Sequence, residues 1–276
     1  MARESPIVTL GITMARQRLG QHFLGNTAWR NRILGTLPRN SADAWIEIGA
    51  GHGEMTELLA TRARRVIAIE TDERLLPRLR ARAHAEWNNV EIVAGDVLTL
   101  DFASLASGTF RVYGNLPYYI TSPILHRLFA YAAQIASIHI VIQLEVAERI
   151  AARPERRDYG YLSVLCQYYS KPEIVLRIPP GAFRPPPRVK SALVKLTLPG
   201  ARVSLGLSDD KKFLEFVQEC FSHKRKTLRN NLLALATDER IHRVLSACGF
   251  RSDARAEQLT LAQFAALYRE IVSPGA

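Results

Sequence analysis

Between residues 44 and 144, short runs of apolar, largely β-branched residues alternate with stretches that have helical spacing. The apolar runs are Ala44–Ile48, Val66–Glu70, Val90–Val93, Phe110–Tyr113 and Ile138–Leu144. The stretches with helical spacing include Met55–Arg62, Glu73–Glu86 and Pro123–Ala133. Strands that are apolar on both faces are typical of parallel sheets covered by helices on both sides. The alternation therefore predicts an α/β fold built on a mostly parallel sheet.

Two further strand-like runs, Glu173–Ile178 and Ala192–Leu198, are joined by a basic loop rich in proline. Because proline is tolerated at sheet edges, they predict an antiparallel edge hairpin, which makes a seven-stranded sheet. Beyond this hairpin the helical stretches are Lys211–Cys220, Arg225–Ala236, Ile241–Cys248 and Leu261–Val272. The sequence thus predicts a flexible tail over residues 1–15, an α/β domain over 16–200 and a small helical domain over 201–276.

The chain is strongly basic, with 37 Lys and Arg against 26 Asp and Glu and a formal net charge of +11. Six arginines and one glutamate lie in residues 1–40, and ten basic and three acidic residues lie between Arg149 and Lys195. Basic segments on either side of a balanced centre indicate an RNA-facing rim around a separate pocket. Arginines that only keep the surface soluble are the open alternative.

No apolar run approaches the ~18–20 residues that span a bilayer, and the first residues lack the pattern of a signal peptide. Three scattered cysteines, Cys166, Cys220 and Cys248, form neither a CxxC motif nor a cluster with histidine. We therefore expect no membrane segment, no metal site and no disulfide framework, and we expect a cytoplasmic protein with reduced thiols.

A glycine-rich turn, Gly49-Ala50-Gly51-His52-Gly53, follows the first predicted strand. Glycines let the backbone approach a ligand closely, although a plain connection between a strand and a helix can look the same. The second strand ends at Glu70, where a carboxylate can accept hydrogen bonds from a ribose diol, and Asp96 follows the third strand. Ligands of open α/β sheets bind at the carboxyl ends of the strands, so Gly49, Gly51, Glu70 and Asp96 predict one pocket. The GxGxG spacing with two acids favours S-adenosylmethionine over a nicotinamide cofactor.

The fourth predicted strand ends in Gly114-Asn115-Leu116-Pro117-Tyr118-Tyr119. The Asn115 amide oxygen and the Leu116 carbonyl form an acceptor pair for the two hydrogens of an exocyclic amine, which aims the nitrogen lone pair at a methyl donor. Pro117 stiffens the turn, and Tyr118 offers a face on which an unstacked base can stack. Catalysis would then depend on proximity and alignment. In isolation the string is also compatible with a simple turn.

Together these motifs resemble those of KsgA-type ribosomal RNA adenine dimethyltransferases, and the similarity runs from about Arg16 to the C-terminus. The matching segments are Leu19–Leu24, Glu47–Gly53, Glu70, Gly95-Asp96, Asn115–Tyr118, Phe183–Ser191 and Lys224–Leu232. The resemblance implies a Rossmann-like class I methyltransferase fold, with S-adenosylmethionine bound by residues 16–200. It also implies a product of two adjacent N6-dimethyladenosines near the 3′ end of 16S rRNA, in the small ribosomal subunit or its precursor.

The resemblance also implies roles for individual residues. Contacts with S-adenosylmethionine are expected from His22, Leu24, Gly49, Glu70, Asp96 and Asn115. Phe183 is expected to lie opposite Tyr118, so that the two rings sandwich a base extruded from the RNA. Two positions depart from the family pattern: His22 replaces the usual Asn, and Asn26 replaces a common Asp. A backbone contact would survive the first change, and the helix N-cap would survive the second.

RNA contacts are expected from two basic segments. Lys224, Arg225, Lys226 and Arg229 are predicted to lie on a helix of the C-terminal domain, whereas Arg184 and Arg188 belong to the proline-rich loop. The Lys224–Leu232 segment also favours this family over its nearest rival, the macrolide-resistance methyltransferases that modify 23S rRNA.

Three other functions share parts of the pattern. A DNA adenine methyltransferase usually has an Asp-Pro-Pro-Tyr motif, which differs from the string at Asn115. A non-catalytic ribosome assembly factor would not need intact Glu70, Asp96 and Asn115, and a nicotinamide oxidoreductase would bind NAD. We expect a monomeric enzyme without a metal ion.

Overall fold

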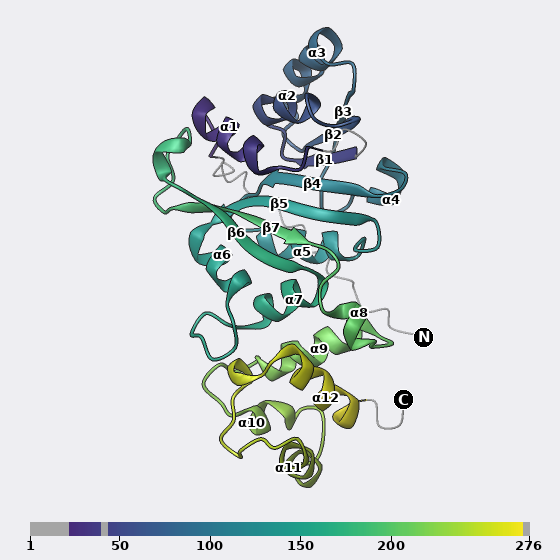
Figure 1. The fold of residues 1–276 in the computed structure, drawn as a ribbon, viewed down its shortest axis with the longest axis vertical. Helices are drawn as coiled ribbons and strands as arrows, with labels where there is room; N and C mark the ends of the chain where they lie inside the picture. Colours follow the sequence, from purple (N-terminus) through teal and green to yellow (C-terminus); the bar gives the residue numbers. More distant parts are fainter. Residues whose placement is uncertain (1–21, 40–43, 273–276) are drawn as a thin grey trace, which may run out of the picture.

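Residues 22–39 and 44–272 are described by the computed structural model, and they form a seven-stranded sheet flanked by helices (Figure 1). The strands are β1 Ala44–Ile48, β2 Arg65–Glu70, β3 Val90–Ala94, β4 Phe110–Asn115, β5 Ile135–Gln143, β6 Lys171–Ile178 and β7 Ser191–Thr197. Their order is β3-β2-β1-β4-β5-β7-β6. Strands β1 to β5 pair in parallel, and β7 runs antiparallel between β5 and β6. The predicted mostly parallel sheet with an antiparallel edge hairpin is confirmed.

The chain order reverses at β1, which pairs with β2 on one side and with β4 on the other. From β1 the chain moves outward through β2 and β3, and it then returns to form β4 and β5 on the opposite side. At such a reversal the connections that follow neighbouring strands diverge and leave a crevice at the carboxyl ends of the strands. The topology therefore places a binding site next to the ends of β1 and β4.

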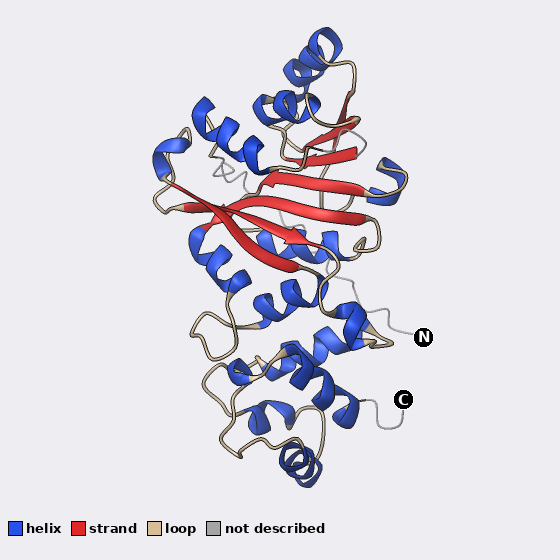
Figure 2. Cartoon of the chain, viewed as in Figure 1, coloured by secondary structure: helices blue, strands red, loops and turns tan. Residues whose placement is uncertain are grey.

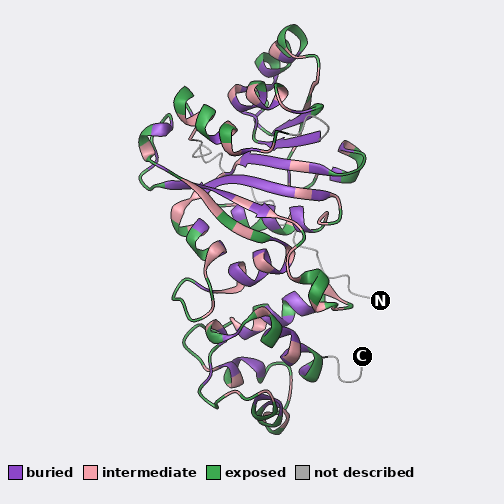
Figure 3. Cartoon of the chain, in the orientation of Figure 1, coloured by how far each residue is buried: buried purple, intermediate pink, exposed green. Residues whose placement is uncertain are grey.

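Helices cover both faces of the sheet (Figure 2). In this part of the chain they are α1 Thr27–Thr36, α2 Glu54–Ala60, α3 Leu76–Glu86, α4 Phe102–Leu105, α5 Thr121–Phe129, α6 Leu144–Ala151 and α7 Tyr161–Tyr169. Helices α1 and α2 pack on Trp45 and Tyr113 on one face, and α5 and α7 pack on Ile46 and Ile140 on the other. Figure 3 shows the central strands as largely buried and the outer sides of the helices as exposed. No helix in the described residues is long and apolar enough to cross a membrane.

The sequence pattern does not indicate helices α6 and α7. Leu144, predicted as the end of a strand, instead begins α6 directly after β5. Helix α7 buries Val164, Leu165, Cys166 and Tyr168 together. Because apolar side chains surround most of its axis, α7 lacks the one-sided periodicity by which surface helices are recognised.

The C-terminal part of the chain forms α8 Arg202–Leu205, α9 Asp210–Cys220, α10 Leu228–Leu232, α11 Asp238–Ala247 and α12 Leu261–Ile271. The predicted helix Arg225–Ala236 is wrong in its limits. Helix α10 begins only after Thr227, whose hydroxyl accepts a hydrogen bond from the N–H of Asn230 at 3.3 Å and caps the helix. An N-cap residue has extended backbone, so the residues that precede it do not continue the helix. Lys224 to Lys226 therefore lie in an exposed turn rather than on a helix.

The C-terminal helices share a core with the α/β part. Phe213 on α9 and Tyr268 on α12 belong to the same buried cluster as the isoleucines of the sheet. The ring of Tyr168 on α7 lies 5.0 Å from that of Phe213, and its hydroxyl donates to Asp210 at 2.6 Å. The proposed division after residue 200 stays a prediction. The predicted tail over residues 1–15 and the motif residues 19–21 lie outside the described residues.

Candidate active site

A pocket opens where the carboxyl ends of β1, β2, β3 and β4 meet. Of the predicted site residues, the lining includes His22, Gly49, Gly51, Glu70, Asp96, Asn115, Leu116, Pro117 and Tyr118. The topology therefore gathers the glycine-rich turn, both acids and the Asn-Leu-Pro-Tyr string in one place.

The glycine-rich turn after β1 is held by Glu70. Gly49 and Gly51 have φ values of +75° and +59°, which residues with a side chain adopt infrequently. A Cβ atom on Gly49 would have only the Asn115 carbonyl oxygen near it, at 3.9 Å, so the backbone there is open to a ligand. One carboxylate oxygen of Glu70 accepts from the N–H of Gly51 at 2.7 Å, and the other accepts from two N–H groups after β2 at 2.9 and 2.8 Å.

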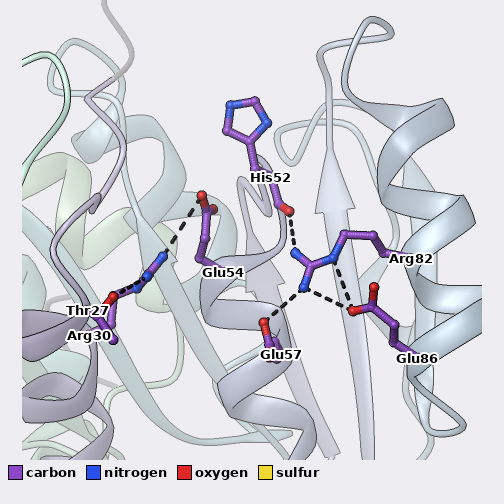
Figure 4. Close-up of polar contacts among 7 residues, drawn as sticks. All are labelled: Thr27, Arg30, His52, Glu54, Glu57, Arg82 and Glu86. Atoms are coloured by element: carbon purple, nitrogen blue, oxygen red, sulfur yellow. Dashed lines mark hydrogen bonds and ion pairs between the residues drawn. The ribbon is translucent and has the colours of Figure 1, made fainter.

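Two arginines brace the same turn from outside, as Figure 4 shows. Arg82 of α3 donates to the His52 carbonyl at 2.9 Å and to the Glu57 carboxylate at 2.9 Å. Arg30 of α1 lies 4.0 Å from Glu54 at the start of α2. Because helices on both sides hold the turn, little conformational freedom is left to lose when a ligand binds.

The segment that precedes α1 is tied to the loop between β6 and β7. Phe23 and Arg184 exchange two backbone hydrogen bonds at 3.0 and 2.8 Å, and His22 Nδ1 donates to the Pro185 carbonyl at 2.7 Å. Asn115 Nδ2 in turn donates to the His22 carbonyl at 2.8 Å. This bond fixes the orientation of the Asn115 amide, and no donor in residues 22–39 or 44–272 hydrogen-bonds its Oδ1. The Asn115 oxygen is thus left to accept from a ligand.

The turn after β4 holds Tyr118 in place. Leu116 is buried, and its N–H donates to the Val141 carbonyl at 3.0 Å. The Tyr118 hydroxyl shares a hydrogen bond of 2.8 Å with the Ser191 hydroxyl, and its ring stacks on that of His22 at 5.8 Å between centroids. Burial raises the pKa of the Tyr118 phenol, which therefore stays neutral. The pocket thus contains a fixed aromatic ring beside hydrogen-bond acceptors.

Two predicted residues do not line this pocket. Leu24 is 7% exposed and Phe183 is 0% exposed, and both pack in the core cluster around Trp45. The structure does not bring the Phe183 ring to the pocket surface opposite Tyr118. The lining instead includes Phe23, whose ring would be 3.0 Å from a Cβ atom on Gly51.

Tyr119 also lines the pocket, and the sequence motifs assign it no role. The sequence signal for it is the consecutive pair of aromatic residues, Tyr118 and Tyr119, after Pro117.

The lining fits S-adenosylmethionine, which supplies an activated methyl group when bound. The open backbone at Gly49 allows close approach, and Glu70 lines the pocket, where its carboxylate can accept from a hydroxyl group. Asp96 is exposed on the rim, where its Oδ1 accepts from the Leu98 N–H at 2.9 Å and its other oxygen faces no described donor. A carboxylate accepts more than one hydrogen bond per oxygen, so both acids keep capacity for a ligand.

Glu47, two residues before Gly49, is a buried carboxyl. It is 2% exposed, and its Oε2 has no hydrogen-bond partner among the residues the structure describes. Burial, together with the nearby Glu70 and Glu54, raises the pKa of Glu47 to about 8. Desolvation disfavours the charged form, so Glu47 is protonated at neutral pH in the folded protein.

We expect Glu47→Gln to flatten the pH dependence of the unfolding free energy. The folded protein keeps this proton up to about pH 8, whereas a glutamate with its ordinary pKa loses it near pH 4.5. Folding therefore takes up a proton between these values, and stability that is fully present below pH 4.5 is lost as the pH rises to 8. The pKa difference corresponds to a loss of unfolding free energy on the order of 5 kcal/mol. Denaturant unfolding at about pH 5 and about pH 9 measures it, with exposed Glu91→Gln as the control. An equal pH dependence in Glu47→Gln and wild type would contradict the assignment.

The basic residues Lys224, Arg225 and Lys226 are exposed in the turn between α9 and α10. Lys224 Nζ donates to the carbonyl of Arg157 at 3.4 Å, which brings this turn against the connection between α6 and α7. The two connections lie side by side in Figure 1. Arg153 and Arg156 are also exposed on the α6–α7 connection, so the structure joins two basic segments that are far apart in the sequence.

The other predicted RNA contacts differ from one another. Arg184 and Arg188 are exposed on the loop between β6 and β7. Arg229 on α10 instead forms a two-pronged ion pair with Asp238, in which its Nε and Nη2 each face one of the two carboxylate oxygens. A paired arginine is less available to a phosphate, so Arg229 is the weakest of the predicted RNA contacts.

A family model described as Ribosomal RNA adenine dimethylase matches residues 12–273. The protein called Ribosomal RNA small subunit methyltransferase A in Acidobacterium capsulatum is 43% identical, over 93% of this chain and 91% of its own length. Its counterpart in Xanthomonas campestris pv. campestris is 41% identical over 91% of this chain and 94% of its own length. The protein of that name in Geobacillus thermodenitrificans is 38% identical over 91% of this chain and 89% of its own length.

Two solved structures share the fold over most of the chain. A dimethyladenosine transferase from Plasmodium falciparum has a TM-score of 0.78 and 25% identity, covering 90% of this chain and 97% of the other. The 23S rRNA methyltransferase ErmE has a TM-score of 0.66 and 28% identity, covering 90% and 99%. These likenesses confirm the Rossmann-like methyltransferase fold, and the family confirms an enzyme that uses S-adenosylmethionine. The chain belongs to the ribosomal RNA adenine dimethylase family.

Proposed function

We propose that this enzyme dimethylates N6 of two adjacent adenosines near the 3′ end of 16S rRNA, in the cytoplasm and as a monomer. The substrate is the RNA within the small ribosomal subunit or its precursor. One observation supports the chemistry above all: Asn115, whose Nδ2 donates to the His22 carbonyl, lines a pocket that fits S-adenosylmethionine and has no described donor to its amide oxygen. The name of the small-subunit methyltransferases, 38–43% identical to this chain, supports the substrate.

In this proposal, the chain's own groups hold the amine. Asn115 Oδ1 and the Leu116 carbonyl accept the two amino hydrogens, which turns the nitrogen lone pair toward the methyl donor. Tyr118 stacks on the extruded adenine, and its hydrogen bond to Ser191 keeps the ring from turning away. The nitrogen becomes acidic once methylated, so its proton passes to solvent without a strong base. The rate gain comes from alignment of bound groups.

The expected cofactor contacts are His22, Gly49, Gly51, Glu70, Asp96 and Asn115, all of which line the pocket. Leu24 would contribute through its backbone, because its side chain is buried. Phe183 could complete the base sandwich only after leaving the core cluster in which it is packed.

RNA is proposed to lie against the exposed turn at Lys224, Arg225 and Lys226, with Arg184 and Arg188 nearer the pocket. Reversing the charge of Lys224, Arg225 and Lys226 together should weaken binding to small-subunit particles and reduce the slope of log Kd against log salt. The reason is that each phosphate contact releases about 0.7–0.9 counterion when the complex forms, and this release is absent for every contact that the variant has lost. Binding measured over a salt series checks both effects.

The matched control reverses the charge of Arg64, Arg78 and Arg80, which are exposed on the α2–β2 connection and on α3. This variant has the same net charge as the variant at Lys224, Arg225 and Lys226. A salt slope that falls equally in both triple variants would show a general charge effect and would remove the turn from the RNA interface.

The alternative with the same fold is a 23S rRNA methyltransferase, as the likeness to ErmE illustrates. Incubation with labelled S-adenosylmethionine separates the two. We expect methyl groups to enter small-subunit particles that lack the modification and not large-subunit particles. Labelling of the large subunit alone would overturn the proposed substrate.

A further inference from the structure

Tyr119 is an exposed aromatic residue at the pocket. Its side chain is 63% exposed, although it lines the same pocket as Tyr118. No hydrogen bond or ring contact from a described residue holds its side chain. The proposed mechanism makes no use of it.

The backbone that presents Tyr119 is fixed. The Ile120 N–H donates to the Pro117 carbonyl at 3.3 Å, and the next residue begins α5. The Tyr118 hydroxyl bonds with Ser191, whereas Tyr119, the following residue, is exposed. The structure thus places two aromatic side chains in succession, one inside the pocket and one exposed.

The substrate has a matching feature, if the proposed function holds. Two adjacent adenosines are modified, and only one adenine at a time can occupy the Tyr118 position. The other adenosine is covalently next to it and must therefore lie close outside the pocket. An unstacked base is stabilised by an aromatic platform, and a purine, which presents the larger face, stacks more strongly than uridine.

We propose that Tyr119 stacks on the adenosine adjacent to the one in the pocket. This inference rests on the proposed function and deepens it, because it assigns a residue that selects a purine neighbour. Tyr119 would thus contact whichever of the two adenosines does not occupy the Tyr118 position, either before or after its own methylation.

The test crosses enzyme variants with RNA variants. Wild type, Tyr119→Ala and Tyr119→Phe are assayed on small-subunit particles whose 16S rRNA carries either both adenosines or one adenosine and one uridine. Tyr119→Ala should raise KM for the unaltered particle by about five- to hundredfold, as loss of one stacked base predicts. Tyr119→Phe should keep most of the activity, because the ring face remains. Affinity for S-adenosylmethionine should not change in either variant.

The decisive reading is the coupling between residue and neighbouring base. Uridine in place of the neighbour should raise KM clearly for wild type and hardly at all for Tyr119→Ala. Val203→Ala, which alters a 68% exposed residue on α8, is the control and should behave as wild type. An equal effect of uridine on wild type and Tyr119→Ala, or an unchanged KM in Tyr119→Ala, would overturn the inference. Failure of the proposed function would look different, because wild type would then not methylate these particles at all.

Discussion

Asn115→Ala is expected to lower kcat for methyl transfer by about 10²–10³-fold or more, the effect of removing one preorganised hydrogen-bonding group from an active site. Alanine removes both the Oδ1 acceptor for the amine and the Nδ2 donor that ties the pocket to the His22 carbonyl. Affinity for S-adenosylmethionine should fall by about tenfold at most, because a neutral hydrogen bond contributes about 0.5–1.5 kcal/mol and the glycine-rich turn and Glu70 are unaltered. Single-turnover kinetics with calorimetry for the cofactor separates the two quantities.

Asn89→Ala provides the matched control for this experiment. The Asn89 amide also donates to backbone carbonyls, those of Ala60 and Ala63 at 2.9 Å each, but it precedes β3 at the opposite end of the sheet from the pocket. Its loss should reduce stability and leave kcat near the wild-type value. Unchanged turnover in Asn115→Ala would contradict the acceptor-pair mechanism, whatever the behaviour of the control.

Glu70→Ala should raise the Kd for S-adenosylmethionine by about 10²-fold or more. The Glu70 carboxylate accepts three backbone hydrogen bonds and orders the turn that contains Gly51, and it is also the proposed acceptor for the ribose. Hydrogen bonds to charged groups contribute about 1.5–3 kcal/mol each, so loss of the ribose contact alone accounts for roughly tenfold or more. Disorder of the turn adds to this.

Titration calorimetry measures the change, with Glu91→Ala as the control. Glu91 is an exposed carboxylate on β3 that pairs with Arg65, away from the pocket. Glu70→Gln should lie between the two, because an amide keeps one of the two acceptor oxygens. A cofactor Kd in Glu70→Ala equal to that of the control would mean that Glu70 is not part of the cofactor site.

Much of the fold follows from local sequence. Runs such as Val66–Ile69 are apolar on both faces, a pattern that is typical of a parallel strand covered on both sides. Gly49, Glu70, Asp96 and Asn115 each follow or end a strand, and the rule that parallel strands end at one edge suffices to bring them together.

The features that the sequence did not predict depend on contacts between distant segments. Helix α7 is buried on several sides, so its residues have no amphipathic period. The capping of α10 by Thr227 moves Lys224 out of the helix, and only the folded chain brings Lys224 to Arg157. The pairing of Phe23 with Arg184 joins segments more than 150 positions apart, which no local pattern encodes. The burial of Phe183 is likewise a result of tertiary packing.

The fold is shared with both a dimethyladenosine transferase and a 23S rRNA methyltransferase, so the fold alone does not identify the RNA substrate. Specificity must lie in surfaces such as the Lys224 turn and in the residues at the pocket mouth. This is why the position of the modified adenosines is the central question.

The most direct test maps the product. Small-subunit particles that lack the modification are incubated with the protein and S-adenosylmethionine, and the 16S rRNA is digested and analysed by mass spectrometry. We expect two adjacent adenosines near the 3′ end to gain two methyl groups each, and no other nucleotide to change. Methylation at any other position, monomethyl products that persist with excess cofactor, or no transfer by the wild-type protein would contradict the account.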